Sequence, residues 1–153
     1  MATNVQKKNY FCRKYEINML SKVTNWIKSH PATVSLVLVI WYLSLFTPPE
    51  TQLSEIRFFD KWTHLAMYGT LTGILWVEDW HTWHGAPSRW RVACLYLAPV
   101  AMSGLIELAQ AYCTTDRSGD WLDLGANAVG ALLGIGAGYL ATRWLAHQDW
   151  TRR

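Results

Sequence analysis

The chain has 153 residues, of which 51% are hydrophobic and 16% charged, with ten Trp, seven Tyr and a formal net charge of +3. Soluble globular domains carry roughly 25% charged residues and disordered chains are poor in aromatic residues, so the composition disfavours both classes. Three cysteines at scattered positions offer neither a disulfide framework nor metal-ligand spacing. The length suits one domain with a modest core.

Residues 1–30 form a basic tail. Ile17, Leu20, Thr24 and Ile27 recur at helical spacing with lysines beside them. The tail is therefore either a helix on the membrane surface or a solvated segment that only sets topology. Its long basic part, and the lack of a small-residue cleavage site after the first apolar run, argue against a cleavable signal peptide.

Four apolar runs follow the tail, at Ala32–Phe46, Trp62–Val77, Val92–Ala111 and Leu124–Ala146. They are too long for strands and show no period-two alternation. A spanning helix needs about 20 residues, so adjoining interfacial residues must complete the first two runs. The pattern predicts an all-α bundle of four transmembrane helices over residues 31–146, with a short tail over residues 147–153. A soluble bundle of buried helices is the alternative.

The basic residues predict an orientation for this bundle. With a cytoplasmic N-terminus, only Arg57, Lys61 and Arg117 of the 14 basic residues fall on the outer side. The positive-inside rule therefore places both termini in the cytoplasm. Most Trp residues, Trp76 among them, fall near the expected membrane boundaries and suggest an aromatic belt.

Polar residues within and next to the runs gather at the outer ends of the predicted helices. In chain order they are Asp60, His64 and Tyr68 on the second helix, Glu107 and Gln110 on the third, Asp120, Asp123 and Asn127 on the fourth, and Arg117 in the loop before it. Each set has helical spacing and shares one face. Ionisable groups in hydrocarbon are costly and usually face the bundle interior, so we expect the three sets to meet.

Structural explanations compete with a functional one at these positions. Asp60 and Asp120 lie at helix N-termini, where carboxylates cap free amides and meet the positive end of the helix dipole. His64 and Glu107 lie further inside, where they form either a satisfied structural pair or part of a polar pocket. We expect Arg117 to come within hydrogen-bonding distance of Glu107 or Asp123.

Small residues recur every fourth position on the fourth predicted helix, at Ala126, Gly130, Gly134 and Gly138. In this register they allow helices to approach closely in lipid. We interpret this stripe as a packing device. Gly125 and Gly136 lie off it.

Three motifs in order resemble those of the VanZ-like membrane proteins, over about residues 58–140. They are Asp60-Lys61-Trp62-Thr63-His64 with Tyr68, then Glu107-Leu108-Ala109-Gln110, then Arg117 with Asp123, Asn127 and Gly130. The resemblance implies a small multi-pass bundle in the bacterial cytoplasmic membrane. It also implies a link, in some members, to low-level resistance to glycopeptide antibiotics, notably teicoplanin.

The first functional hypothesis is an outward-facing polar pocket that binds, or acts on, an anionic or lipid-linked component of the cell envelope. His64 and Glu107 are its candidate catalytic residues, because a histidine transfers protons near neutral pH and a carboxylate can orient it. Arg117 is suited to hold a phosphate or carboxylate. The candidate ligand-binding residues are Arg117, Asp123, Asn127, Gln110, Tyr68, Asp60 and Lys61.

The second hypothesis is a structural or accessory membrane protein whose polar residues lock the helices together. A proton path or transporter is a third and weaker reading, because the inner halves of the helices offer few polar residues. We expect no cofactor, no metal site, since His64 has no second His or Cys nearby, and no nucleic acid partner. The lipid bilayer is the expected partner, and oligomeric state and reaction stay open.

Overall fold

The computed structural model is all-α and describes residues 18–45, 58–83, 87–113 and 120–151. These residues contain no strand, which confirms for this part of the chain that the fold is all-α. The chain divides into two compact units, Met1–Pro31 and Ala32–Arg153.

The described part of the first unit is a helix over residues 18–29. Leu20, Val23, Trp26 and Ile27 are exposed on it. The Trp26 indole stacks on the His30 imidazole with 4.6 Å between ring centroids. A helix is therefore present over these residues, Ile17 of the predicted pattern lies outside the described residues, and the choice between a membrane-surface helix and a solvated segment stays open.

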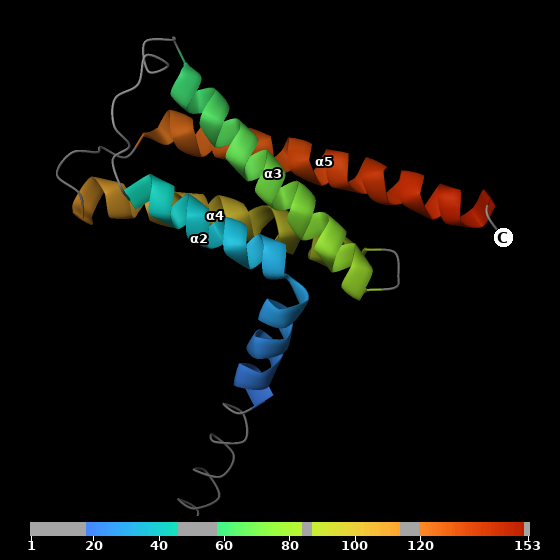
Figure 1. Ribbon diagram of the computed structural model, residues 1–153. Coiled ribbons are helices and arrows are strands. Elements are labelled where there is room, and N and C mark those ends of the chain that lie inside the picture. Colours follow the sequence, from blue (N-terminus) through green and yellow to red (C-terminus); the bar gives the residue numbers. More distant parts are fainter. Residues whose placement is uncertain (1–17, 46–57, 84–86, 114–119, 152–153) are drawn as a thin grey trace, which may run out of the picture. The chain divides into compact units, whose positions relative to one another are not determined.

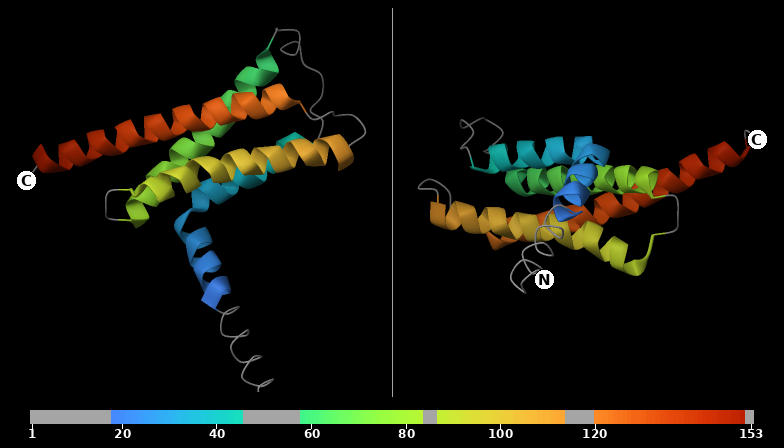
Figure 2. Two further views of the ribbon diagram at one scale, coloured as in Figure 1. Left: turned by 180° about the vertical axis from the view of Figure 1, so that it is seen from behind. Right: turned by 90° about the horizontal axis from the view of Figure 1, so that it is seen from below.

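Four helices follow, α2 (Pro31–Leu45), α3 (Phe59–Thr82), α4 (Arg89–Cys113) and α5 (Trp121–Thr151). Figures 1 and 2 show that they alternate in direction and that α3 crosses α5. The ends of α2 and α4 therefore lie beside the beginnings of α3 and α5 at one end of the bundle (Figure 1). We call this the site end. Most of the predicted C-terminal tail, residues 147–153, continues α5 as far as Thr151.

Within the described residues, α4 and the Trp121–Gln148 part of α5 are long and apolar enough to cross a membrane. The α2 helix is apolar but has only 15 residues. The α3 helix carries Asp60, Lys61, Glu78 and Asp79 near its two ends, and it does not meet the same test. Membrane-helix character is thus present, and four spans with cytoplasmic termini stay a prediction.

Close backbone contact joins α3 to α5. A Cβ atom on Gly130 would collide with the Leu65 carbonyl oxygen, and one on Gly134 would collide with the Gly69 carbonyl and the Thr72 hydroxyl. The predicted glycine stripe is therefore confirmed as a packing device. Gly69, which the sequence analysis did not single out, faces this stripe from α3, with 3.2 Å between a built Cβ and the Gly130 carbonyl oxygen.

Side-chain hydrogen bonds reinforce this α3–α5 contact. The Thr72 hydroxyl donates to the Ala131 carbonyl at 2.9 Å, and the Trp76 indole N–H donates to the Thr142 hydroxyl at 3.1 Å. Trp76 is 6% exposed and packs against Gly138. The indole lies between the helices rather than on the outer surface of the bundle, because the glycine opposite it leaves room there, and its depth in the membrane stays a prediction.

The α2 and α4 helices pack against α3 through a small apolar core. Ile40, Tyr68, Leu71 and Ile106 are its buried members. In lipid such side chains stabilise a bundle through close packing rather than through transfer out of water. This core brings α2, α3 and α4 together next to the polar residues of the site end.

The opposite end of the bundle is held by two acidic residues that the sequence analysis did not single out. The Glu78 carboxylate accepts the Ala32 and Thr33 backbone N–H groups at 2.9 and 3.1 Å, which caps the start of α2. The Asp79 carboxylate accepts two hydrogen bonds from the Arg91 guanidinium, both at 2.6 Å. These contacts tie the end of α3 to α2 and α4.

The glycine contact predicts a position-specific loss of stability. Gly134→Ala would place a methyl group against the Gly69 carbonyl and the Thr72 hydroxyl, so we expect it to lower the free energy of unfolding by about 1–3 kcal/mol. Gly136→Ala is the matched control, because nothing lies within 4 Å of its built Cβ. Thermal unfolding in detergent measures the stability of both variants. Equal losses of stability would contradict a specific role for the close α3–α5 contact at Gly134.

Candidate functional site

Polar side chains from α3, α4 and α5 meet at the site end in two layers. The ionic cluster consists of Asp60, Lys61, His64, Asp120 and Asp123. The neutral network beneath it consists of Tyr68, Ser103, Gln110 and Asn127. His64 belongs to the first layer and contacts the second.

Lys61 joins the start of α3 to the start of α5. Its ammonium donates to Asp120 Oδ2 at 2.5 Å and to Asp123 Oδ1, and it lies 3.7 Å from Asp60 Oδ2. The Lys61 side chain is 24% exposed and that of Asp123 only 12%. This ion pair is partly withdrawn from water, so it is screened less than a surface pair.

Asp120 acts both as a helix cap and as an ion-pair partner. Its Oδ1 atom accepts the Leu122 backbone N–H at 2.8 Å. The hydrogen bond from Lys61 and this backbone N–H hold the pKa of Asp120 below its usual 3.8. A lowered pKa in the folded state contributes stability above pH 3.8, and this contribution is lost as the pH falls through the lowered value.

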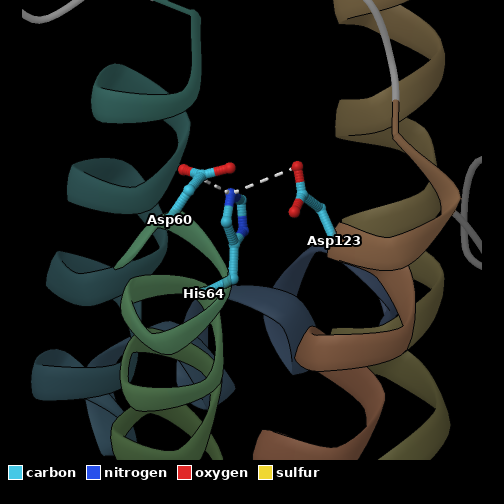
Figure 3. Close-up of side chains that lie close together, drawn as sticks. All are labelled: Asp60, His64 and Asp123. Atoms are coloured by element: carbon cyan, nitrogen blue, oxygen red, sulfur yellow. Dashed lines mark ion pairs between the residues drawn. The ribbon is translucent and has the colours of Figure 1, made fainter. Parts of the chain in front are cut away.

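Asp60 does not share this capping role. The residue before α3, Phe58, has φ 66° and α3 begins there without a side-chain capping bond. The Asp60 carboxylate, 63% exposed, instead points toward His64 (Figure 3), with 3.7 Å between Asp60 Oδ1 and His64 Nε2. A capping hydrogen bond is thus present at Asp120, whereas Asp60 lies in the first turn of α3, near the positive end of the helix dipole.

His64 lies between the two layers with its side chain 10% exposed. Asn127 Nδ2 donates to Ser103 Oγ at 2.6 Å, which leaves Asn127 Oδ1 facing His64 Nδ1 at 3.1 Å. The imidazole therefore donates through Nδ1–H to Asn127. Its Nε2 atom faces Asp60 on one side and Asp123 Oδ2, at 3.8 Å, on the other (Figure 3).

The neutral network extends from Asn127 across the bundle. Ser103 on α4 is fully buried and hydrogen-bonds both Asn127 and Tyr68. Gln110 donates from Nε2 to the Ser44 carbonyl of α2 at 2.8 Å. All four helices of the second unit are thereby linked at this depth.

The Glu107 carboxylate contacts the site through the backbone of Asp120. Its Oε2 atom accepts the Asp120 N–H at 2.9 Å, so a carboxylate of α4 holds the start of α5. From the sequence, Glu107 was the residue expected to orient His64. The structure gives that contact to Asn127, because Asn127 faces His64 directly across the α3–α5 contact.

The structure thus brings Asp60, Lys61, His64, Asp123 and Asn127 together, with Glu107 beside them. Tyr68 and Gln110 lie in the deeper network, and Arg117 lies outside the described residues. Binding and catalytic roles at all these positions stay predictions. Ser103 was missed, because a lone serine in an apolar run carries no signal of its own. Lys61 was predicted as a ligand-binding residue, and its pairing with Asp120 and Asp123 was not.

Comparison with known proteins gives one family. The family model described as VanZ/LLP1 matches residues 3–142. No curated protein matches the chain, and no solved structure matches it.

The neutral network predicts that Ser103 is a stability residue. Ser103→Ala leaves the buried Asn127 amide without its acceptor, so the free energy of unfolding should fall by about 1–3 kcal/mol. Thr63→Ala is the control, because the exposed Thr63 hydroxyl bonds only within its own helix, to the Phe59 carbonyl. Thermal unfolding in detergent compares the two, and an unchanged Ser103→Ala protein would rule out the network as a stabilising element.

Proposed function

The chain belongs to the VanZ/LLP1 family, and from this premise we propose that it is a multi-pass protein of the bacterial cytoplasmic membrane. In this proposal the ionic cluster faces the outer side. There it binds, or acts on, an anionic or lipid-linked component of the cell envelope. Resistance to glycopeptides, notably teicoplanin, is the phenotype proposed to follow.

The observation that carries this proposal is the excess of ionised groups over what helix packing needs. Charged groups near hydrocarbon cost at least a few kcal/mol each unless they are paired. The glycine contact and the neutral network already join the helices with uncharged groups. Yet Asp60, Lys61 and Asp123 surround His64 in addition, which supports a chemical role for the cluster.

The groups of the cluster suit proton transfer to a bound ligand. A histidine titrates near neutral pH, and His64 presents Nε2 toward the exposed Asp60 side while Asn127 holds Nδ1. Arg117 follows α4 and precedes α5 in the chain, so we propose it as the guanidinium that holds the anionic group of the ligand. Glu107 holds the start of α5 and thereby positions Asp123.

A structural or accessory role is the second candidate. The hydrogen-bonded series His64–Asn127–Ser103 and the Gln110–Ser44 bond favour it, because each polar group in them has a partner. Fully satisfied networks of this kind rigidify and specify a packing arrangement. In this case, a substitution at any of the polar positions would weaken the resistance phenotype only as far as it lowers the stability of the protein.

Two measurements on the same purified variants separate these candidates. Arg117→Ala and His64→Gln should weaken binding of undecaprenyl phosphate, in nanodiscs, by about tenfold or more, because each removes a group facing the anion. Ser103→Ala should lower stability and leave binding of the folded fraction unchanged. Cells producing the unchanged chain should tolerate more teicoplanin than cells producing Arg117→Ala.

Thr63→Ala is the control for both measurements, because Thr63 lies one residue from His64 but bonds only its own helix. Losses of stability at Arg117, His64 and Ser103 in equal measure, with no separate effect on binding, would replace the ligand-binding proposal with the structural one.

The proposed topology has its own test. A reporter fused after Arg153 and a second inserted near Ser118 should report opposite sides of the membrane, because the charge distribution places only the second outside. Accessibility to a membrane-impermeant reagent in intact cells measures this. Two reporters on the same side would contradict the outward orientation of the cluster.

A further inference from the structure

We infer that Asp60, His64 and Asp123 form a binding site for a divalent transition-metal ion of the Zn²⁺ or Mn²⁺ class. The sequence analysis expected no metal site, because His64 has no second histidine or cysteine beside it. The three residues come from two helices and meet only in the folded chain (Figure 3). One ligand atom from each lies within 4.8 Å of the others.

Two of the three separations within this group, those from the imidazole to each carboxylate, suit ligands of one ion better than they suit hydrogen bonds, and the two carboxylate oxygens lie within 4.8 Å of each other. His64 Nε2 lies 3.7 Å from Asp60 Oδ1 and 3.8 Å from Asp123 Oδ2. Hydrogen bonds between such atoms are normally 2.7–3.2 Å long. Two atoms that each lie about 2.1 Å from one ion are separated by roughly 3–4 Å.

Hydrogen bonds from the neutral network fix the orientation of the His64 imidazole. Metal-binding histidines commonly donate their other ring N–H to a fixed acceptor, which leaves the second nitrogen free to coordinate. Asn127 Oδ1 is such an acceptor for Nδ1, and Ser103 in turn holds Asn127. His64 is nine-tenths buried, and its Nε2 lone pair is thereby directed between the two carboxylates.

Lys61 contacts one oxygen of each carboxylate and leaves the other oxygen for the proposed metal ion. Its ammonium takes Asp123 Oδ1 and approaches Asp60 Oδ2, while Asp123 Oδ2 and Asp60 Oδ1 face His64. Among the described groups, Asp60, Asp120, Asp123 and the adjacent Glu107 are acidic, whereas Lys61 is the basic one. The described part of the site is therefore rich in carboxylates, whose charge a bound dication would offset.

The donor set selects the class of ion. Carboxylates suit Mg²⁺, Ca²⁺ and Mn²⁺, whereas imidazole suits Zn²⁺, Fe²⁺ and other transition metals. One imidazole with two carboxylates therefore favours Zn²⁺ or Mn²⁺ over Mg²⁺ and Ca²⁺. Three protein ligands leave further coordination positions open, as catalytic sites do, on the side where Asp60 is exposed.

Such an ion deepens the proposed function, on which this part of the inference rests. The described cluster is net negative and would repel an anionic ligand. A bound dication would reverse this and accept the phosphate or carboxylate of the envelope component directly. The ligand class shared by both proposals is thus an oxyanion at the membrane surface.

The test uses the full chain in nanodiscs, stripped with a chelator and titrated with Zn²⁺, Mn²⁺ or Mg²⁺. We expect one Zn²⁺ or Mn²⁺ per chain and weaker binding of Mg²⁺. Asp60→Asn and His64→Gln should each weaken binding by about tenfold or more. Asp60 is exposed, so Asp60→Asn keeps the fold. His81→Gln is the matched control on α3, since His81 is exposed and distant from the cluster.

Binding that persists in both variants, or falls equally in His81→Gln, would overturn the metal site. Undecaprenyl phosphate binding is measured in parallel on metal-free and metal-loaded protein. Equal lipid binding in both states would overturn the role of the ion and leave the proposed function standing. Stoichiometric metal binding without lipid binding in either state would overturn the proposed function and leave the metal site standing.

Discussion

The close backbone contact between α3 and α5 determines where the other groups of the site lie. Gly130 admits the Leu65 carbonyl without a side chain between them. His64 precedes Leu65, and Asn127 lies one turn before Gly130, so the same contact sets the imidazole against the amide. Lys61 and Asp123 lie one further turn toward the site end and form the ion pair. A shift of α3 along α5 would disturb all three contacts together.

Depth along this contact separates uncharged from charged groups. The neutral network lies deeper, where an unpaired polar group is costly and each described member has a hydrogen-bond partner. The ionic cluster lies at the helix ends, where Asp60 remains exposed and Lys61 partly so. Among the members of the two layers, His64 contacts both. A change in its protonation or coordination would therefore change how α3 packs against α5.

Helical spacing was sufficient to predict the elements and the faces on which polar residues lie. The glycine stripe and the polar sets on α3, α4 and α5 follow from the helical period of 3.6 residues, and the apolar runs follow from their length. Spacing cannot identify partners on another helix, because it says nothing of register between helices. Asn127 rather than Glu107 therefore holds His64, and Ser103 was not foreseen. The burial of Trp76 was not foreseen for the same reason, since Gly138, which makes room for it, lies 62 positions further along the chain.

The two ends of the bundle show how structural and chemical uses of acidic residues differ. Asp79 forms two hydrogen bonds with one guanidinium, and Glu78 neutralises the positive end of the α2 dipole. Each of these charges has a partner that accounts for it. At the site end three aspartates share one ammonium, Asp120 accepts a helix N–H, and Asp60 and Asp123 lie in the first turns of α3 and α5. Within the described residues these carboxylates outnumber the basic groups beside them, and all three lie within reach of His64 or Lys61. This concentration of acidic groups around His64 is the feature that a bound cation, with or without an oxyanion, would complete.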